Sequence, residues 1–258
     1  MLRGSIRIGS FLGVPLFIHW TFLLLVAWSL AGPLTSGSPD AMPLALRTAG
    51  FMLAIFGCVL LHEMGHALAA RRYGIATRDI ILLPIGGLAR LERMPEKPSQ
   101  ELVVALAGPA VNVVIAALII PAVLATQGIG AFTGEPEAGT GNGELSLHLT
   151  HFIASLGAVN VFLVLFNMIP ALPMDGGRVL RAVLTMLLPP PYNRARATAI
   201  SAAIAKVVAV GFVIYGLYTG EFFLMLIGIF VFMGAAAEAR AARVQPARRI
   251  PRDWQAPP

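Results

Sequence analysis

Six long apolar runs divide the chain, and segments containing polar residues, Gly and Pro separate them. The runs cover residues 14–31, 44–70, 102–126, 149–169, 197–218 and 222–237. A helix needs about 20 apolar residues to cross the hydrocarbon core of a bilayer, and most of the runs reach that length. The pattern therefore predicts an all-α polytopic membrane protein with about six transmembrane helices.

The first run has a second interpretation as a secretory signal peptide. Arg3 and Arg7 precede it, and Ser29 and Ala31 form a weak small-residue cleavage site. Its apolar part, however, is longer than the roughly 7–15 residues typical of a signal, and more apolar runs follow. We therefore expect a retained membrane helix.

Composition also favours a membrane protein. Hydrophobic residues make up 57% of the chain and charged residues only 12%, which is too little polar surface to cover a soluble globule. The formal net charge is +6, but the basic residues lie in short segments between apolar runs and not on a soluble basic face. We therefore expect the lipid bilayer, and no nucleic acid, as a partner.

The positions of Lys and Arg predict the orientation of the chain. Nearly all of them lie before the first run, between the second and third, after the fourth and after the sixth. Arg47 lies on the opposite side, and Lys206 falls inside the fifth run. Because cytoplasmic loops are rich in Lys and Arg, both termini are expected to face the cytoplasm. The compact, Ala- and Arg-rich composition favours a prokaryotic plasma membrane.

The run pattern predicts a single transmembrane domain over residues 1–244, followed by a disordered cytoplasmic tail over residues 245–258. Between the second and third runs, apolar strings at residues 80–83 and 88–91 flank Pro84, Gly86 and Gly87. This is typical of a short membrane-associated β-hairpin, whose edge at Gly86 and Gly87 could bind an extended peptide by strand addition. An amphipathic connector at the interface explains the same residues equally well.

A candidate metal motif lies near the end of the second run, where His62 and His66 enclose Glu63. Residues four apart share one helix face, so both imidazoles can reach one ion. Zinc acidifies a bound water, and the carboxylate of Glu63 can take its proton. Ionisable side chains at membrane depth are costly, which favours a metal site over a chance arrangement.

Two histidines leave such a site one ligand short, because catalytic zinc normally takes three protein ligands and a water. The fourth run ends in Asn167, two prolines, Asp175 and paired glycines. Asp175 is the only acid in or near that run. It suits a metal ligand and equally the N-cap of a following helix, so the residues alone leave both roles open.

Together the two motifs resemble those of the site-2 proteases, intramembrane zinc metalloproteases of peptidase family M50. That family pairs His-Glu-x-x-His with a later Asn-x-x-Pro-x-x-Pro-x-Asp-Gly-Gly, and both stand here in that order, at residues 62–66 and 167–177. The resemblance implies one Zn²⁺ per chain, held by His62, His66 and Asp175. It also implies Glu63 as the catalytic acid and base, and Asn167 as a donor to the oxyanion.

Other segments extend the resemblance. Gly108 and Pro109, followed by Asn112, are similar to a further family element. Asn112 could hydrogen-bond a zinc ligand or stabilise helix packing. The opening, residues 4–22, resembles members that lack an inserted PDZ domain. Many such members end in paired CBS domains, whereas this chain stops soon after its sixth run, so the resemblance does not imply regulation by adenine nucleotides through such domains.

The expected function is hydrolysis of peptide bonds within or next to transmembrane segments of membrane protein substrates, with an accessory or regulatory membrane protein as a further partner. One rival is another membrane zincin whose third ligand is one of four glutamates: Glu92, Glu96, Glu101 or Glu238. The others are a membrane metal transporter and a catalytically inactive membrane chaperone. The strong ligand candidates cluster at one depth, which argues against a transport path.

Overall fold

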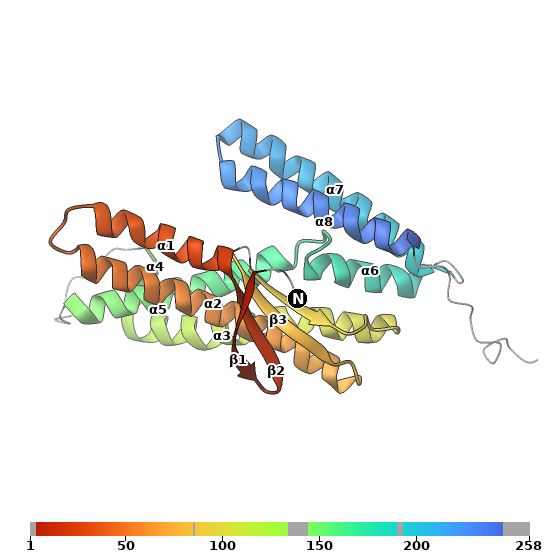
Figure 1. The fold of residues 1–258 in the computed structure, drawn as a ribbon, viewed down its shortest axis with the longest axis horizontal. Helices are drawn as coiled ribbons and strands as arrows, with labels where there is room; N and C mark the ends of the chain where they lie inside the picture. The colour runs from red at the N-terminus through yellow and green to blue at the C-terminus, as the bar shows by residue number, and fades with distance from the viewer. Residues whose placement is uncertain (1–3, 85, 134–143, 190–192, 245–258) are drawn as a thin grey trace, which may run out of the picture. The chain divides into compact units, whose positions relative to one another are not determined.

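The computed structural model describes residues 4–84, 86–133, 144–189 and 193–244, and it is mostly helical with one small sheet (Figure 1). Two compact units divide the chain, Met1–Asn167 and Met168–Pro258. The predicted disordered tail, residues 245–258, lies outside the described residues.

In the described ranges, five helices are long and apolar enough to cross a membrane, in agreement with a multi-span protein. They are α2 (Ala41–Arg72), α3 (Pro98–Gln127), α5 (Glu144–Asn167), α7 (Asn193–Thr219) and α8 (Phe222–Val244). Helix α1 (Trp20–Thr35), which belongs to the first apolar run, is shorter than these five and has 16 residues. At about 1.5 Å per residue it extends roughly 24 Å, less than the roughly 30 Å of a hydrocarbon core.

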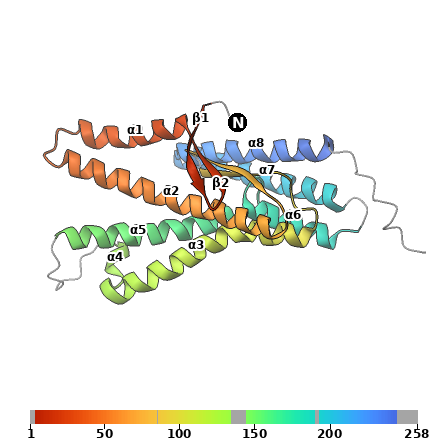
Figure 2. The same ribbon diagram turned by 60° about the horizontal axis from the view of Figure 1, so that its bottom comes forward.

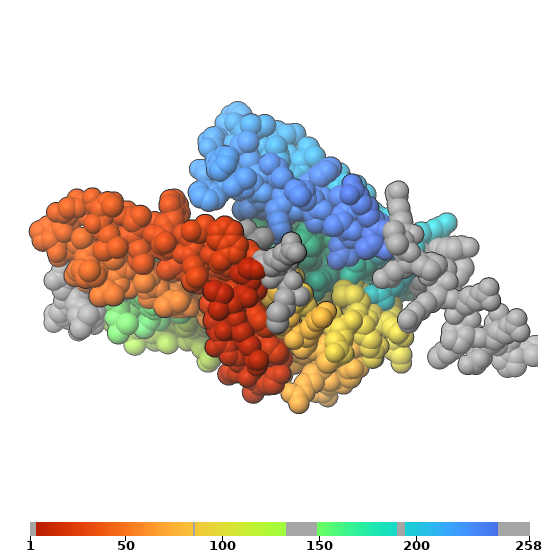
Figure 3. Space-filling model, viewed as in Figure 1, coloured from red at the N-terminus to blue at the C-terminus, as the bar shows by residue number. Residues whose placement is uncertain are grey.

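The first predicted span is wrong over Val14–His19, which form strand β2. Strand β1 (Ser5–Phe11) pairs antiparallel with β2, and Figure 3 shows this hairpin, in dark red, on the surface of the first unit. The turn at Leu12 and Gly13 has φ angles of 49° and 85°, as a two-residue hairpin turn requires. A continuous apolar run does not distinguish a buried strand from a helix, and the helix begins only after His19.

The hairpin predicted after the second run is confirmed as β3 (Thr77–Leu83) and β4 (Gly86–Leu91). It belongs, however, to a four-stranded sheet in the order β1-β2-β3-β4, in which β2 and β3 are parallel. Ile80 and Ile81 are adjacent and both fully buried, as expected of a strand that is covered on both faces. The all-α prediction is therefore corrected to a mostly helical protein with a small sheet.

The sheet packs against α2 beside the metal motif. Leu16 from β2 and Ile80 from β3 form a core cluster with Met64, the residue after Glu63. A second cluster joins the end of α2 to α3: Ala70, Ile75 and Val104. Figures 1 and 2 show α2, α3 and α5 running side by side. The sheet and two helices thus hold the face of α2 that carries the histidines.

The second unit contains α6 (Asp175–Leu187), α7 and α8. α7 and α8 form a helical hairpin that turns at Gly220, where φ is 75° (Figure 1). α6 is joined to α8 by an ion pair between Arg181 Nη1 and Glu238 Oε2 at 2.9 Å. The arginine side chain is buried, so this pair fixes one face of α6 against the hairpin.

Candidate metal centre

Helix α2 presents His62 and His66 one turn apart on its buried face. Their exposed fractions are 5% and 4%. The Nε2 atoms of the two rings face each other at 3.1 Å. Two ligands of a tetrahedral zinc ion, each about 2.0–2.1 Å from the metal, lie roughly 3.3 Å apart, so the pair has the spacing of two zinc ligands.

The other nitrogen of the His66 ring has a partner that sets its protonation. Nδ1 lies 2.7 Å from the carbonyl oxygen of Val104 on α3. A carbonyl oxygen only accepts, so Nδ1 carries the proton and donates it. In the neutral ring Nε2 is then the unprotonated nitrogen, which is the form that binds a metal ion.

His62 is held by a chain of two buried amides. Its Nδ1 lies 2.5 Å from Oδ1 of Asn112, and Nδ2 of Asn112 donates to Oδ1 of Asn160 at 2.7 Å. Both asparagines have an exposed fraction of 0%. Asn112 therefore contacts the candidate ligand and also joins α3 to α5.

Sequence reasoning did not single out Asn160. It lies in the middle of α5, inside the fourth apolar run and outside the two motifs. The position of Asn160 could have indicated its importance, because an amide in the middle of an apolar span costs free energy unless it has hydrogen-bond partners. The structure supplies those partners: Nδ2 of Asn160 donates to Leu156 O at 2.8 Å and to Cys58 Sγ at 3.3 Å.

Two glycines let α3 approach the histidine face of α2. A Cβ on Gly108 would lie 2.7 Å from Nε2 of His62 and closer still to Nε2 of His66. One on Gly65 would lie 2.6 Å from Ala107 O. Neither position has room for a side chain, so the Ala-Gly-Pro element places bare backbone against the ligand atoms.

The side chain of Glu63 contacts strand β4 of the sheet. Its Oε2 accepts a hydrogen bond from the backbone N–H of Ala89 in β4 at 2.9 Å. A Cβ on Gly87 would overlap the Glu63 side chain, so the strand can come this close only with glycine there. Gly86 has a φ of 135° and begins β4. Both predicted glycines thus lie in the strand that contacts Glu63.

An ion pair inside the hairpin fixes this strand. Arg90 Nε donates to Oδ1 of the buried Asp79 at 2.6 Å, and Nη2 donates to the other oxygen. The hydrogen bond and the charge of Asp79 raise the pKa of Arg90 above its usual value, against the opposing effect of burial. β4 is therefore held in register on β3 within a few residues of Ala89.

In the second unit, Asp175 is the first residue of α6. The N-cap position belongs to Met174, so Asp175 is not the capping residue. Gly176 packs on the carbonyl groups of Met168 and Ile169, where a Cβ would overlap them. The Pro- and Gly-containing segment thus folds tightly on itself to place Asp175 at the helix start.

Asn167 is the last residue of α5, and its Nδ2 donates to Leu163 O at 2.9 Å. Of the four glutamates of the rival zincin, Glu238 is paired with Arg181 at 2.9 Å and Glu96 lies 3.8 Å from Arg93.

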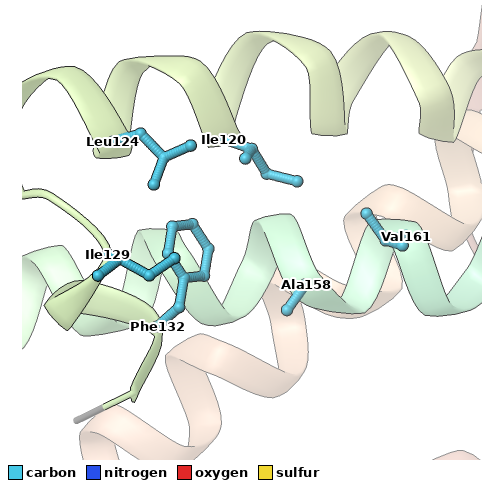
Figure 4. Close-up of a pocket in the computed structure, with 6 residues that line it drawn as sticks. All are labelled: Ile120, Leu124, Ile129, Phe132, Ala158 and Val161. Atoms are coloured by element: carbon cyan, nitrogen blue, oxygen red, sulfur yellow. The ribbon is translucent and has the colours of Figure 1, made fainter.

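An apolar hollow of about 300 Å³ lies between α3, α4 (Gly130–Thr133) and α5 (Figure 4). Its lining residues are Ile120, Leu124, Ile129, Phe132, Ala158 and Val161. None of these side chains carries a nitrogen, oxygen or sulfur atom. The hollow therefore offers no ligand to a metal ion and no acid or base.

Known proteins similar to this chain include zinc metalloproteases. The family model described as Peptidase family M50 matches residues 50–210 of this chain. A zinc metalloprotease of Methanocaldococcus jannaschii is 31% identical over 244 residues, which are 95% of this chain and 63% of that protein. A relative from Synechocystis is 33% identical over 260 residues, 95% of this chain and 62% of its own length.

A solved structure of a site-2 protease from Methanocaldococcus jannaschii is also similar. The TM-score is 0.63 at 31% identity, over 92% of this chain and 95% of that one. The chain spans just over three-fifths of the curated relatives, 63% and 62% of their lengths.

Proposed function

The chain belongs to peptidase family M50, and we propose on this premise that it is an intramembrane zinc metalloprotease. It would hydrolyse peptide bonds within or next to transmembrane segments of membrane proteins. The observation that carries the proposal is the buried pair His62 and His66, whose Nε2 atoms lie 3.1 Å apart while each Nδ1 has a partner. Such a pair holds a metal ion with ligand atoms already oriented.

Asp175 is our proposed third ligand, giving one Zn²⁺ per chain. Two imidazole nitrogens and one carboxylate form a usual donor set for catalytic zinc, with a fourth position left for water. Asp175 starts a helix in a tightly packed turn and is not needed there as an N-cap. In this proposal residues 1–244 act as one catalytic domain.

Glu63 is the proposed acid and base. Zinc held at this site would supply a Lewis acid that lowers the pKa of water and polarises a peptide carbonyl. Glu63 takes the proton of the attacking water and delivers it to the leaving amine nitrogen. The Ala89 N–H, 2.9 Å from Oε2, orients the carboxylate and leaves the other oxygen for the proton. Asn167 would donate a hydrogen bond from Nδ2 to the oxyanion once its hydrogen bond to Leu163 O has broken.

The depth of the histidines supports cleavage inside the membrane. His62 precedes Arg72, the last residue of α2, by roughly 15 Å along the helix axis. Arginines at a helix end mark the membrane interface, and half of a hydrocarbon core is about 15 Å thick. We propose that the active site and both termini face the cytoplasm, in the plasma membrane of a prokaryote.

A substrate inside a membrane helix has its peptide groups hydrogen-bonded, so it must become extended before it is cut. We assign this task to β4, the last strand of the sheet order, which begins at Gly86 and whose Gly87 lies beside Glu63. An extended segment would pair with this edge by strand addition. An accessory or regulatory membrane protein would control access of the substrate.

The test compares membranes from cells that express the wild type or Glu63→Gln, and searches for new peptide termini in or beside transmembrane segments. Termini found only with the wild type are expected, while the Glu63→Gln protein keeps its zinc. A Glu63→Gln protein that cleaves as fast as the wild type would exclude the role of Glu63. Zinc uptake into sealed vesicles by both proteins would favour a transporter instead.

A separate variant tests the third ligand. Asp175→Ala should lose zinc from the purified protein, because two imidazoles alone hold the ion weakly. Undiminished zinc content in Asp175→Ala would show that another residue completes the site.

A further inference from the structure

A series of hydrogen bonds links Asn160, Asn112 and His62, and the contacts of Asn160 set their direction. Leu156 O is a backbone carbonyl and can only accept, so the atom of Asn160 that lies 2.8 Å from it must be the amide nitrogen. The same nitrogen lies 3.3 Å from Cys58 Sγ, a weak acceptor. The oxygen of Asn160 therefore points the other way, toward α3.

The orientation of Asn160 determines the direction of the next two hydrogen bonds. The Asn160 oxygen accepts from Nδ2 of Asn112 at 2.7 Å, which turns the Asn112 oxygen toward His62. That oxygen, 2.5 Å from Nδ1 of His62, requires a proton on Nδ1. In a neutral ring that is protonated at Nδ1, Nε2 is the unprotonated nitrogen that can bind a metal ion. Without the hydrogen bond from Asn160 to Leu156 O, Asn112 could turn its amide nitrogen to the His62 ring and favour the opposite tautomer.

We propose that Asn160 is a positioning residue of the metal site: acting through Asn112, it holds His62 in the tautomer whose Nε2 binds the ion. The inference rests on the proposed function, because it needs a metal at His62. Complete burial of both amides strengthens the coupling, since no water competes for their hydrogen bonds in the interior.

Cys58 offers a matched control. It lies one helical turn before His62 and also contacts Asn160, but through the nitrogen and not through the oxygen that faces Asn112. Cys58→Ala removes a weak acceptor and leaves the links from Leu156 to His62 intact. It therefore reports on packing near the amides without changing their direction.

The experiment measures zinc affinity of the purified full chain in detergent, by competition with a chelator, for single and double variants. Asn112→Ala should weaken binding about 10–100-fold, as loss of a hydrogen-bond partner of a ligand does. Asn160→Leu should weaken it about fivefold, the effect of one ordinary hydrogen bond on an equilibrium constant. Cys58→Ala should stay within about twofold of the wild type.

The double variant separates positioning from general destabilisation. If Asn160 acts through Asn112, Asn160→Leu has no further effect on affinity once Asn112→Ala is present; independent effects would multiply. Cobalt bound in place of zinc should show an altered visible absorption spectrum in Asn160→Leu and an unchanged one in Cys58→Ala. Multiplicative effects, or an unchanged cobalt spectrum in Asn160→Leu, would overturn the inference.

A second substitution covers the case in which leucine prevents folding. In Asn160→Ser the hydroxyl can bond to the carbonyl four residues back, as Thr126 does with Ala122 O at 2.9 Å, but it cannot reach Asn112. It should weaken zinc binding as much as Asn160→Leu. A wild type that binds no zinc would refute the proposed function itself, whereas zinc binding unaffected by Asn160→Ser would refute only the role of Asn160.

Discussion

Replacing Gly108 by alanine should weaken metal binding without unfolding the protein. The added methyl carbon would lie 2.7 Å from Nε2 of His62 and closer to Nε2 of His66, whereas an ordinary contact is about 3.5 Å. One ring or the α3 backbone must therefore move by about 0.8 Å or more. Zinc–ligand distances tolerate only about 0.2 Å, and a displacement of 1 Å can cost about 100-fold in rate.

We expect zinc affinity to fall about 100-fold in Gly108→Ala, equivalent to about 2.7 kcal/mol at 1.36 kcal/mol per factor of ten. Folding should not suffer to the same degree, because alanine favours a helix interior over glycine by about 1 kcal/mol. The assay is chelator competition on the purified protein, with helix content and thermal unfolding of the metal-free form measured in parallel.

Gly57→Ala is the matched control, since it adds the same methyl group to α2 where no atom lies within 4 Å. It should bind zinc as the wild type does. A Gly108→Ala protein that binds zinc within threefold of the wild type would contradict the claim that α3 backbone packs on the ligand atoms.

Two further predictions concern the strand beside Glu63. Gly87→Ala should displace the Glu63 side chain. The rate of cleavage should fall at least tenfold while zinc affinity changes less than threefold. Equal losses of rate and affinity would show that the strand supports the whole site and not Glu63 alone. Arg90→Met leaves the carboxylate of Asp79 buried without its cation and should destabilise the first unit by roughly 2–4 kcal/mol in denaturant unfolding. Adding Asp79→Leu should restore most of that loss, and a double variant as unstable as the single one would refute the explanation.

The helices and the histidine motif could be predicted from the sequence because their signals are local. Length and apolarity mark α2, α3, α5, α7 and α8, and the spacing of His62 and His66 fixes their common face. The hairpin β3–β4 is equally local, since Gly86 and Gly87 interrupt two apolar strings.

The remaining features depend on partners far away in the chain. β2 has no alternation and joins the apolar run of α1, so only its pairing with β1 and β3 identifies it as a strand. Asn160 belongs to neither motif, and its importance arises from Asn112 and Leu156, one of them on another helix. The contact of Ala89 with Glu63 involves a backbone amide, which a sequence does not distinguish from any other.

The parallel pairing of β2 with β3 gives the chain an order of assembly. α1 and α2 separate β2 from β3 in the sequence, so Leu16 can meet Ile80 only after both helices and β3 have been synthesised. Until then β1 and β2 form an isolated two-stranded ribbon, which is marginally stable by itself. In a nascent chain the histidines of α2 are therefore synthesised before β4, the strand that contacts Glu63. Glu63 can therefore accept its hydrogen bond from Ala89 only once β4 has formed.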